Sequence, residues 1–327
     1  MRAVVLVGGE GTRLRPLTYT VPKQLLPIAG VTMLERVVGG LARHGVDDVV
    51  LSMGYRPDAF REQFPDGRAA GVTLTYAVEP EPRDTAGAIR FAADAAGIDD
   101  TFLVVNGDVL TDLDVGALIA FHRGRGGLAT IALTPVEDPS AFGVVPTDAE
   151  GRVTAFIEKP PRDLAPTNLI NAGTYVLEPE VLALIPPGGR VSIERETFPI
   201  LVGQGRLFAM ASDAYWLDTG TPAQYLKANL DLLDGSALVE PGSSVAPTAR
   251  VCRSVVGAGA RVEDGAEVRD SVLLPDAVVG AGAVVDGSIV GARARIGARS
   301  RLAPVTVVGC DVEVAAGRVL VDERVPA

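Results

Sequence analysis

Histidine, cysteine and aromatic side chains are scarce in this sequence. Of its 327 residues, two are histidines, two are cysteines and only 5% are aromatic. Two cysteines, Cys252 and Cys310, cannot build a disulfide framework, so we expect buried free thiols in a cytoplasmic protein. His44 and His122 lie in no motif, so nothing in the sequence points to a histidine base.

Excess positive charge and long apolar runs are also missing. Lysine and arginine number 30 against 41 acidic residues, which gives a net charge of −11. Surfaces that bind nucleic acid are normally basic, so we expect no nucleic-acid partner. No segment approaches the ~20 apolar residues of a membrane span, and the N-terminal apolar run is too short for a signal peptide. We therefore expect no membrane association and a cytoplasmic location.

Glycine, in contrast, is abundant and follows the first apolar run at once. Residues 3–7 are short and valine-rich, which is typical of a buried strand. The glycines that follow let backbone N–H groups approach a ligand and form a nest for phosphate oxygens. Basic side chains come next and can grip an oxyanion. These loop residues are Gly8, Gly9, Gly11, Arg13, Arg15 and Lys23.

The whole string from Leu6 to Lys23 resembles the signature of the sugar-1-phosphate nucleotidylyltransferases. A lone glycine pair would indicate only a strand-to-helix turn, and the stretch lacks the features of a P-loop or a dinucleotide fingerprint. The resemblance implies that Arg13 and Lys23 bind the triphosphate of a nucleotide. The loop residues implied in nucleotide binding are Leu6, Gly8, Gly9, Gly11, Thr12, Arg13 and Lys23.

Apolar strand and helix patterns alternate through the first 235 residues. Strands are predicted at 3–7, 49–53, 72–78, 102–105 and 129–136, and helices at 32–44, 88–96, 115–122 and 222–234. Thr221 and Gln224 fit the start of the last helix. The alternation predicts an α/β fold with a mixed, mostly parallel sheet, here a Rossmann-like nucleotidyltransferase domain over residues 1–235. Ligands of such sheets bind at the carboxyl ends of strands.

Two aspartates are candidates for a magnesium site. Asp108 follows a predicted strand in Val-Val-Asn-Gly-Asp, and Asp218 lies in Tyr-Trp-Leu-Asp-Thr-Gly. Both strings resemble metal-binding motifs of the family. Mg²⁺ prefers one or two carboxylates together with phosphate oxygens. The resemblance implies that Asp108 and Asp218 hold Mg²⁺ over the triphosphate and the sugar phosphate, with Asp108 also part of the nucleotide site.

The segment from Glu79 to Gly87 resembles the base-binding loop of the family. Guanylyl members tend to have glutamate where Glu79 stands, and thymidylyl members tend to have glutamine. A carboxylate can accept both the N1–H and the amine of guanine. The alternative is that Glu79 is a solvated loop charge. Thr85 and Gly87 complete the implied loop, although Asp84 stands where relatives often have glycine.

Three later motifs resemble the sugar-phosphate site of the family. Gly143 lies in a short predicted strand, Phe142 to Val145, where a sugar hydroxyl can meet the backbone. The resemblance implies that Lys159 in Glu-Lys-Pro binds the 1-phosphate, while Glu158 and Asn171, in Asn-Ala-Gly173, bind sugar hydroxyls. Residues 192–196, Ser-Ile-Glu-Arg-Glu, are similar to guanylyl members, and we expect them to be structural.

The sequence pattern changes after residue 238, where aliphatic residues recur every six positions. The period predicts a left-handed parallel β-helix of hexapeptide repeats over residues 239–327. Such stacks leave an open end, so we expect a homo-oligomer formed through this domain. The expected inward ladder is Val256, Val262, Val268, Leu274, Val278, Val284, Val290, Ile296, Leu302, Val308, Val314 and Leu320.

The mannose-1-phosphate guanylyltransferases are the closest match within the family. The resemblance implies magnesium-dependent transfer from GTP to α-D-mannose 1-phosphate, which gives GDP-mannose and pyrophosphate. Arg13, Lys23, Asp108, Lys159 and Asp218 are the implied catalytic residues. Alternatives are the same chemistry with dTTP, UTP or ATP, or with a glucose, heptose or cyclitol phosphate. A non-catalytic sugar-nucleotide sensor is a further alternative. Acyl transfer by the β-helix is not expected, because residues 239–327 contain no histidine.

Overall fold

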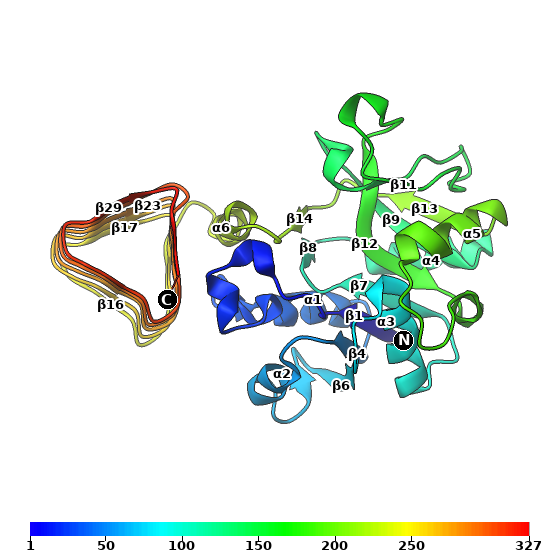
Figure 1. Ribbon diagram of the computed structural model, residues 1–327, viewed down its shortest axis with the longest axis horizontal. Coiled ribbons are helices and arrows are strands. Elements are labelled where there is room, and N and C mark those ends of the chain that lie inside the picture. The colour runs from blue at the N-terminus through cyan, green and yellow to red at the C-terminus, as the bar shows by residue number, and fades with distance from the viewer. Residues whose placement is uncertain (327) are drawn as a thin grey trace. The chain divides into compact units, whose positions relative to one another are not determined.

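The computed structural model describes residues 1–326, and the chain divides into two compact units. The first unit comprises Met1–Gly9 and Leu34–Trp216. The second comprises Glu10–Met33 and the chain from Leu217 onward. These bounds differ from the sequence-based division at residues 235–239, because the segment Glu10–Met33 groups with the β-helix. Figure 1 labels the elements of both units.

A ten-stranded mixed sheet forms the centre of the first unit. Its main order is β11-β10-β12-β7-β1-β4-β6-β5. β1 pairs in parallel with β4 and β7, and β4 with β6, whereas β12 runs antiparallel to β7. The strands are β1 (Arg2–Leu6), β4 (Asp48–Met53), β5 (Arg68–Ala69), β6 (Val72–Val78), β7 (Phe102–Asn106), β9 (Ala129–Pro135), β10 (Gly143–Val144), β11 (Ile157–Glu158), β12 (Leu169–Leu177) and β13 (Leu207–Ala211).

The predicted helices and strands of this unit are present, with shifted ends. Helix α3 (Asp84–Ala96) begins four residues before its predicted start, and α1 (Met33–Ala42) and α4 (Val115–Arg125) lie where the apolar patterns place them. The sequence patterns did not reveal β12, β13, β8 (Val109–Thr111), α2 (Pro57–Gln63), α5 (Phe198–Gly203) or a π-helical turn at Ile193–Thr197. Asn171-Ala-Gly173 therefore lies inside a long strand.

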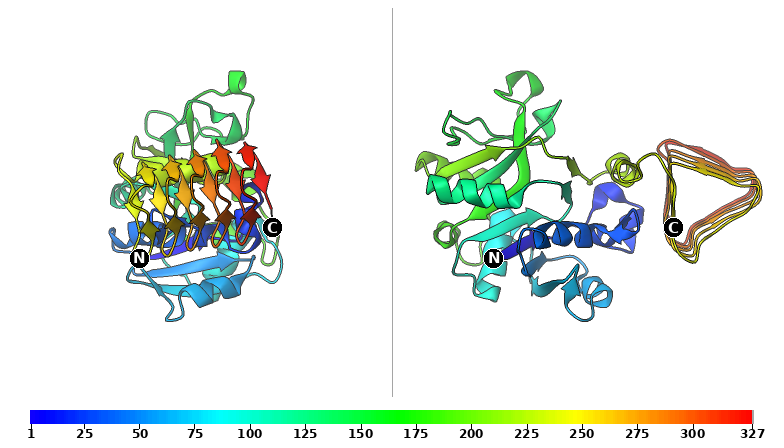
Figure 2. Two further views of the ribbon diagram at one scale, coloured as in Figure 1. Left: turned by 90° about the vertical axis from the view of Figure 1, so that its left-hand side faces the viewer. Right: turned by 180° about the vertical axis from the view of Figure 1, so that it is seen from behind.

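The second unit contains three parallel sheets, consistent with the predicted left-handed β-helix. Figure 1 shows the three-sided coil end on, and the left panel of Figure 2 shows its stacked strands. The first sheet is β15 (Leu238–Val239), β18 (Val255–Val256), β21 (Val272–Leu273), β24 (Ile289–Val290), β27 (Val307–Val308) and β30 (Arg324–Val325). The second is β16 (Ser244–Val245), β19 (Arg261–Val262), β22 (Val278–Val279), β25 (Arg295–Ile296) and β28 (Glu313–Val314). The third is β17 (Arg250–Cys252), β20 (Glu267–Arg269), β23 (Val284–Asp286), β26 (Arg301–Ala303) and β29 (Val319–Val321).

The predicted ladder is wrong at Leu274, Val278 and Val284. The apolar core contains Leu273, Val279 and Val285 instead. Buried serines occupy one corner of the coil, where Ser271 N donates to Ser254 Oγ (3.1 Å) and Ser288 N to Ser271 Oγ (3.0 Å). This corner is one residue shorter than the others in most coils, so the inward step there is five residues. A strict six-residue period therefore drifts by one position.

Shorter elements complete the second unit. Three single 3₁₀ turns, Thr12–Leu14, Leu17–Tyr19 and Lys23–Leu25, precede a β2–β3 hairpin (Pro27–Ile28 and Val31–Thr32). Strand β14 (Trp216–Asp218) leads into α6 (Pro222–Asp231). Thr221 Oγ1 accepts from Gln224 N at 3.3 Å, which confirms the predicted helix start.

Both cysteines are free, as predicted, but only Cys310 is buried. The prediction of a buried thiol is wrong for Cys252, which lies at the end of β17 with its side chain exposed. No helix within residues 1–326 has the length and apolar character needed to cross a bilayer.

Candidate functional site

The glycine loop and Asp108 leave neighbouring strands at the same edge of the sheet. β1 and β7 pair in parallel with Leu6 opposite Asn106. Gly107 N donates to Leu6 O at 3.0 Å. A Cβ on Gly107 would lie 2.8 Å from Val7 Cγ1, so the strands approach this closely only with glycine there. Gly8, Gly9 and Asp108 therefore follow strands that end at the same edge of the sheet.

Glu79 follows β6 and is held by bonds to both carboxylate oxygens. Ser52 Oγ donates to Oε1 (3.0 Å), and Arg83 N donates to Oε2 (3.1 Å). A Cβ on Gly8 would lie 3.8 Å from Oε1, so the carboxylate borders the glycine loop. Burial raises the pKa of Glu79, while the bonds from Ser52 and Arg83 act to lower it. Glu79 is therefore not a freely solvated loop charge.

The other base-loop residues make contacts that account for them structurally. Thr85 Oγ1 donates to Glu194 Oε2 (2.7 Å) and accepts from Ile193 N (2.8 Å). A Cβ on Gly87 would lie 2.4 Å from Gly189 O, so α3 needs glycine to pack there. The segment at residues 192–196 thus supports the start of α3. Nucleotide binding by Thr85 and Gly87 stays a prediction.

Asp84 occupies the position where relatives often have glycine. Its φ is 57°, in the left-handed region that glycine adopts freely and aspartate tolerates better than most residues. Its side chain is exposed, and Oδ1 accepts from Thr85 N at 3.0 Å. The departure is thus accommodated by the backbone at the start of α3.

Strand β12 brings the Asn-Ala-Gly motif against the end of β7. A Cβ on Gly173 would lie 2.6 Å from Asn106 Nδ2, and Gly173 has a φ of 75°. Asn171 Oδ1 accepts from Gly173 N (2.9 Å), and its Nδ2 donates to the Tyr175 hydroxyl (2.8 Å). The pairing of β12 with β9 shifts register between Asn171 and Tyr175. The motif therefore forms a fixed irregularity beside Asn106-Gly107-Asp108.

Gly143 and the Glu-Lys-Pro motif lie on paired strands. Gly143 of β10 is opposite Glu158 of β11, and a Cβ on Gly143 would lie 3.1 Å from Glu158 Oε2. Lys159 has a φ of 51°, and its N donates to Phe142 O at 2.9 Å. Its ammonium is exposed and lies 3.3 Å from Glu158 Oε1. The structure thus brings Gly143, Glu158 and Lys159 together.

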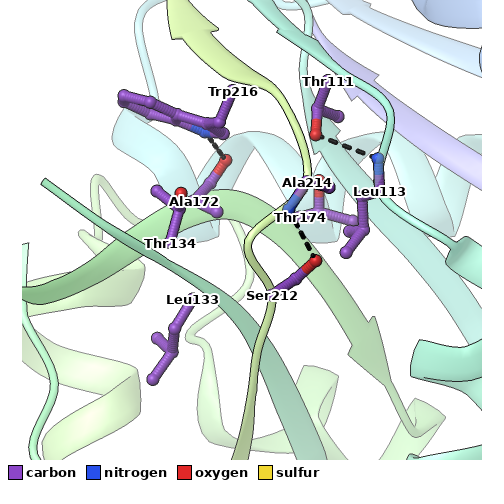
Figure 3. Close-up of a pocket in the computed structure, with 9 residues that line it drawn as sticks. All are labelled: Thr111, Leu113, Leu133, Thr134, Ala172, Thr174, Ser212, Ala214 and Trp216. Atoms are coloured by element: carbon purple, nitrogen blue, oxygen red, sulfur yellow. Dashed lines mark hydrogen bonds between the residues drawn. The ribbon is translucent and has the colours of Figure 1, made fainter.

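Trp216 contacts both β12 and the residue before β10, and the sequence analysis did not single it out. Its indole Nε1 donates to Ala172 O at 2.9 Å, and its ring meets Phe142 edge to face at 5.6 Å. Figure 3 shows the indole above Ala172 in a small pocket that Thr134 and Ser212 also line. The available signal was that Trp216 is the only tryptophan in the chain.

In the second unit, Arg13, Lys23 and Asp218 surround two glycines. A Cβ on Gly220 would lie 2.5 Å from Arg13 Nη2 and 2.9 Å from Asp218 Oδ1. Gly11 has a φ of 65°, and Lys23 Cβ lies 3.1 Å from the position of its missing Cβ. Thr12 is exposed and starts the first 3₁₀ turn. Arg13 is therefore a neighbour of the predicted metal ligand Asp218, and Lys23 packs against Gly11.

A glycine-rich phosphate loop and carboxylates at the strand ends of an α/β sheet, followed by a parallel β-helix, define the nucleotidyltransferase class. A family model described as nucleotidyl transferase matches residues 2–235, and a model described as GMPPB C-terminal domain matches residues 233–326. The chain belongs to the nucleotidyl transferase family.

Curated relatives and a solved structure agree with this assignment. The chain is 43% identical over 277 residues to a mannose-1-phosphate guanylyltransferase of Mycobacterium tuberculosis, covering 80% of this chain and 76% of that protein. It is 40% identical over 245 residues to a mannose-1-phosphate guanyltransferase of Saccharomyces cerevisiae, covering 74% and 67%. HddC from Yersinia pseudotuberculosis, complexed with GMP-PN, matches with a TM-score of 0.60 at 28% identity, covering 71% and 99%.

Proposed function

We propose that this protein is a mannose-1-phosphate guanylyltransferase that forms GDP-mannose and pyrophosphate from GTP and α-D-mannose 1-phosphate. The observation that carries the choice of base is the fixed Glu79 carboxylate beside Gly8. Each of its oxygens has lone pairs beyond those used by Ser52 and Arg83, so it can accept from guanine. The names of the relatives support mannose 1-phosphate as the acceptor.

The reaction needs charge neutralisation and alignment rather than a general base. A phosphate oxygen of the sugar 1-phosphate attacks the α-phosphorus of GTP, and pyrophosphate leaves in line. This oxygen is already ionised at neutral pH, so catalysis comes from positioning and electrostatic stabilisation. In this proposal Arg13 and Lys23 bind the triphosphate, Lys159 binds the sugar phosphate, and Glu158 and Asn171 bind sugar hydroxyls.

Asp108 and Asp218 are the residues that would hold Mg²⁺. Their donor chemistry fits, because carboxylate oxygens are hard ligands and Mg²⁺ takes one or two of them beside phosphate oxygens. Asp218 Oδ1 accepts from Gly220 N at 2.8 Å, which fixes the orientation of the carboxylate. When bound, the ion would neutralise phosphate charge.

The proposal includes a cytoplasmic homo-oligomer that assembles through the β-helix and has no nucleic-acid or membrane partner. Two free cysteines fit a reducing compartment. Val319 and Val321 of β29 are 60% and 58% exposed, which provides apolar surface for a subunit contact.

Pyrophosphate release by the purified protein tests the chemistry. GTP would be offered with mannose 1-phosphate, glucose 1-phosphate or no acceptor, in magnesium and again in excess EDTA. We expect release that requires both mannose 1-phosphate and the metal, and loss of release in Asp108→Asn and Asp218→Asn. Binding of GTP without release from any acceptor would contradict the proposal and favour a sugar-nucleotide sensor.

A further inference from the structure

We propose that Arg324, in the last coil of the β-helix, is a positioning residue for the phosphate loop and thereby controls productive binding of GTP. The inference rests on the proposed function for its kinetic readout. Arg324 Nη1 donates to Arg13 O at 3.0 Å and approaches Arg15 O at 3.4 Å. The arginine thus holds the backbone of the residue whose guanidinium lies over Gly220 beside Asp218.

The loop has little structure of its own to fix this orientation. Its first turn, Thr12–Leu14, is a single 3₁₀ turn, closed by Leu14 N to Gly11 O (2.9 Å) and followed by Arg15 N to Thr12 O (3.2 Å). One such turn has no cooperative stability. The direction in which the Arg13 side chain leaves it therefore depends on contacts from outside the turn.

The β-helix supplies those contacts through its first sheet. Val272, Ile289 and Val307 lie in this sheet, and each is 0% exposed. A Cβ on Gly309 would lie 3.2 Å from Pro16 Cβ. The last coils therefore support the stretch from Arg13 to Pro16 both by close packing and by the bond from Arg324.

The opposite end of the segment contacts the first coil. A Cβ on Gly30 would lie 3.0 Å from Glu240 Oε1. The segment Glu10–Met33 is thus held by contacts with both ends of the stack. In this arrangement the repeat domain serves the reaction directly, in addition to any role in assembly.

Arg324→Ala tests the inference, with Arg301→Ala as the matched control. Arg301 is an exposed arginine in β26, on a different sheet of the same β-helix. Loss of a hydrogen bond from a charged donor at an exposed site lowers kcat/KM for GTP by about threefold to tenfold. The KM for mannose 1-phosphate and the melting temperature stay as in Arg301→Ala. Arg324→Lys recovers part of the lost kcat/KM, because a lysine ammonium can donate to one carbonyl but lacks the forked guanidinium that reaches two.

Hydrogen exchange in the ligand-free protein provides a readout that does not depend on turnover. We expect the amides of Arg13, Leu14, Arg15 and Leu17 to exchange faster in Arg324→Ala than in Arg301→Ala. Equal exchange in the two variants, or an unchanged kcat/KM for GTP, overturns the inference. If the wild type shows no turnover, the proposed function fails, while the exchange result still decides whether Arg324 holds the loop.

Discussion

At the scale of single residues, Glu79 shows how the carboxylate proposed to bind the base is held in a fixed orientation by the fold itself. Ser52 lies 27 positions earlier in the chain, and Arg83 contributes a backbone N–H. The sequence showed the identity of Glu79, but not these partners, because they come together only when β4, β6 and the start of α3 pack. Its identity could therefore be predicted, but its fixed orientation could not.

We expect Glu79→Gln to lower kcat/KM for GTP by about tenfold to a hundredfold. The amide keeps one acceptor but turns an –NH₂ group toward a donor of guanine, and a hydrogen bond to a charged group is worth about 1.5–3 kcal/mol. Initial rates with GTP and dTTP measure the change. Glu81→Gln, at an exposed position two residues away, is the control and should behave as wild type. Equal GTP kinetics in both variants would remove Glu79 from base recognition.

The raised pKa of Glu79 gives a pH dependence with a definite sign. Guanine binding needs the ionised carboxylate, so kcat/KM for GTP falls as pH falls through the raised pKa, and this step is absent in Glu79→Gln. The pH dependence of stability has the opposite sign, because the folded protein binds the Glu79 proton more tightly than the unfolded chain does. The contribution of Glu79 to stability is therefore lost as pH rises from the unfolded pKa to the folded one. A pH–rate profile that is the same in both proteins would contradict this account.

At the scale of elements, two helical glycines should respond oppositely to alanine. Gly87→Ala in α3 places a methyl group 2.4 Å from Gly189 O and destabilises the fold, by about 1–3 kcal/mol for an overpacked site. Gly124 in α4 has nothing within 4 Å of its Cβ position, so alanine stabilises by about 0.5–1 kcal/mol through helix propensity. Urea unfolding of both variants measures the difference. A Gly87→Ala protein as stable as Gly124→Ala would show that α3 does not pack as described.

His122 ties α4 to the sheet and should affect stability without affecting catalysis. Its Nδ1 lies 2.8 Å from Thr130 Oγ1 and its Nε2 lies 2.9 Å from Glu178 Oε1, with the ring buried. His122→Leu leaves these partners unsatisfied and costs about 1–3 kcal/mol of unfolding free energy. We expect an unchanged kcat at a temperature where the variant is folded, with His44→Gln as the control. A large loss of kcat in either variant would contradict this prediction and indicate that a histidine takes part in catalysis.

Pattern reasoning identified the parallel strands and the helices between them, because their apolar residues repeat at 2.0 or 3.6 positions. It missed β12, since Asn171 and Gly173 interrupt the strand pattern at a register shift. It also displaced three ladder positions of the β-helix. That error has a physical origin in the serine corner, where backbone bonds to Ser254 and Ser271 allow a shorter turn.

At the scale of the whole molecule, the compact units group the segment Glu10–Met33, which carries Arg13 and Lys23, with the β-helix. No local pattern predicts this, because Arg13 and Arg324 are 311 residues apart and meet only through the completed coil. The domain division at residues 235–239 was placed where the composition changes. Composition does not indicate which compact unit the segment Glu10–Met33 belongs to.

Assembly gives a further prediction at this scale. Light scattering at micromolar concentration should give a multiple of the 33.9 kDa chain mass. Val319→Thr with Val321→Thr keeps the shape of β29 but makes its exposed face polar, so it should weaken the oligomer. The same change at Val239, an exposed residue of the first coil, is the control. A monomeric wild type would contradict assembly through the β-helix.

The most direct test of the account is a competition between nucleotides in one reaction. The protein would receive equal concentrations of GTP, ATP, UTP and dTTP with magnesium and mannose 1-phosphate, and the sugar nucleotides formed would be identified by mass and retention. The account predicts that GDP-mannose is the main product, because Glu79 selects guanine and the site accepts mannose 1-phosphate. A thymidylyl, uridylyl or adenylyl sugar as the main product would contradict it.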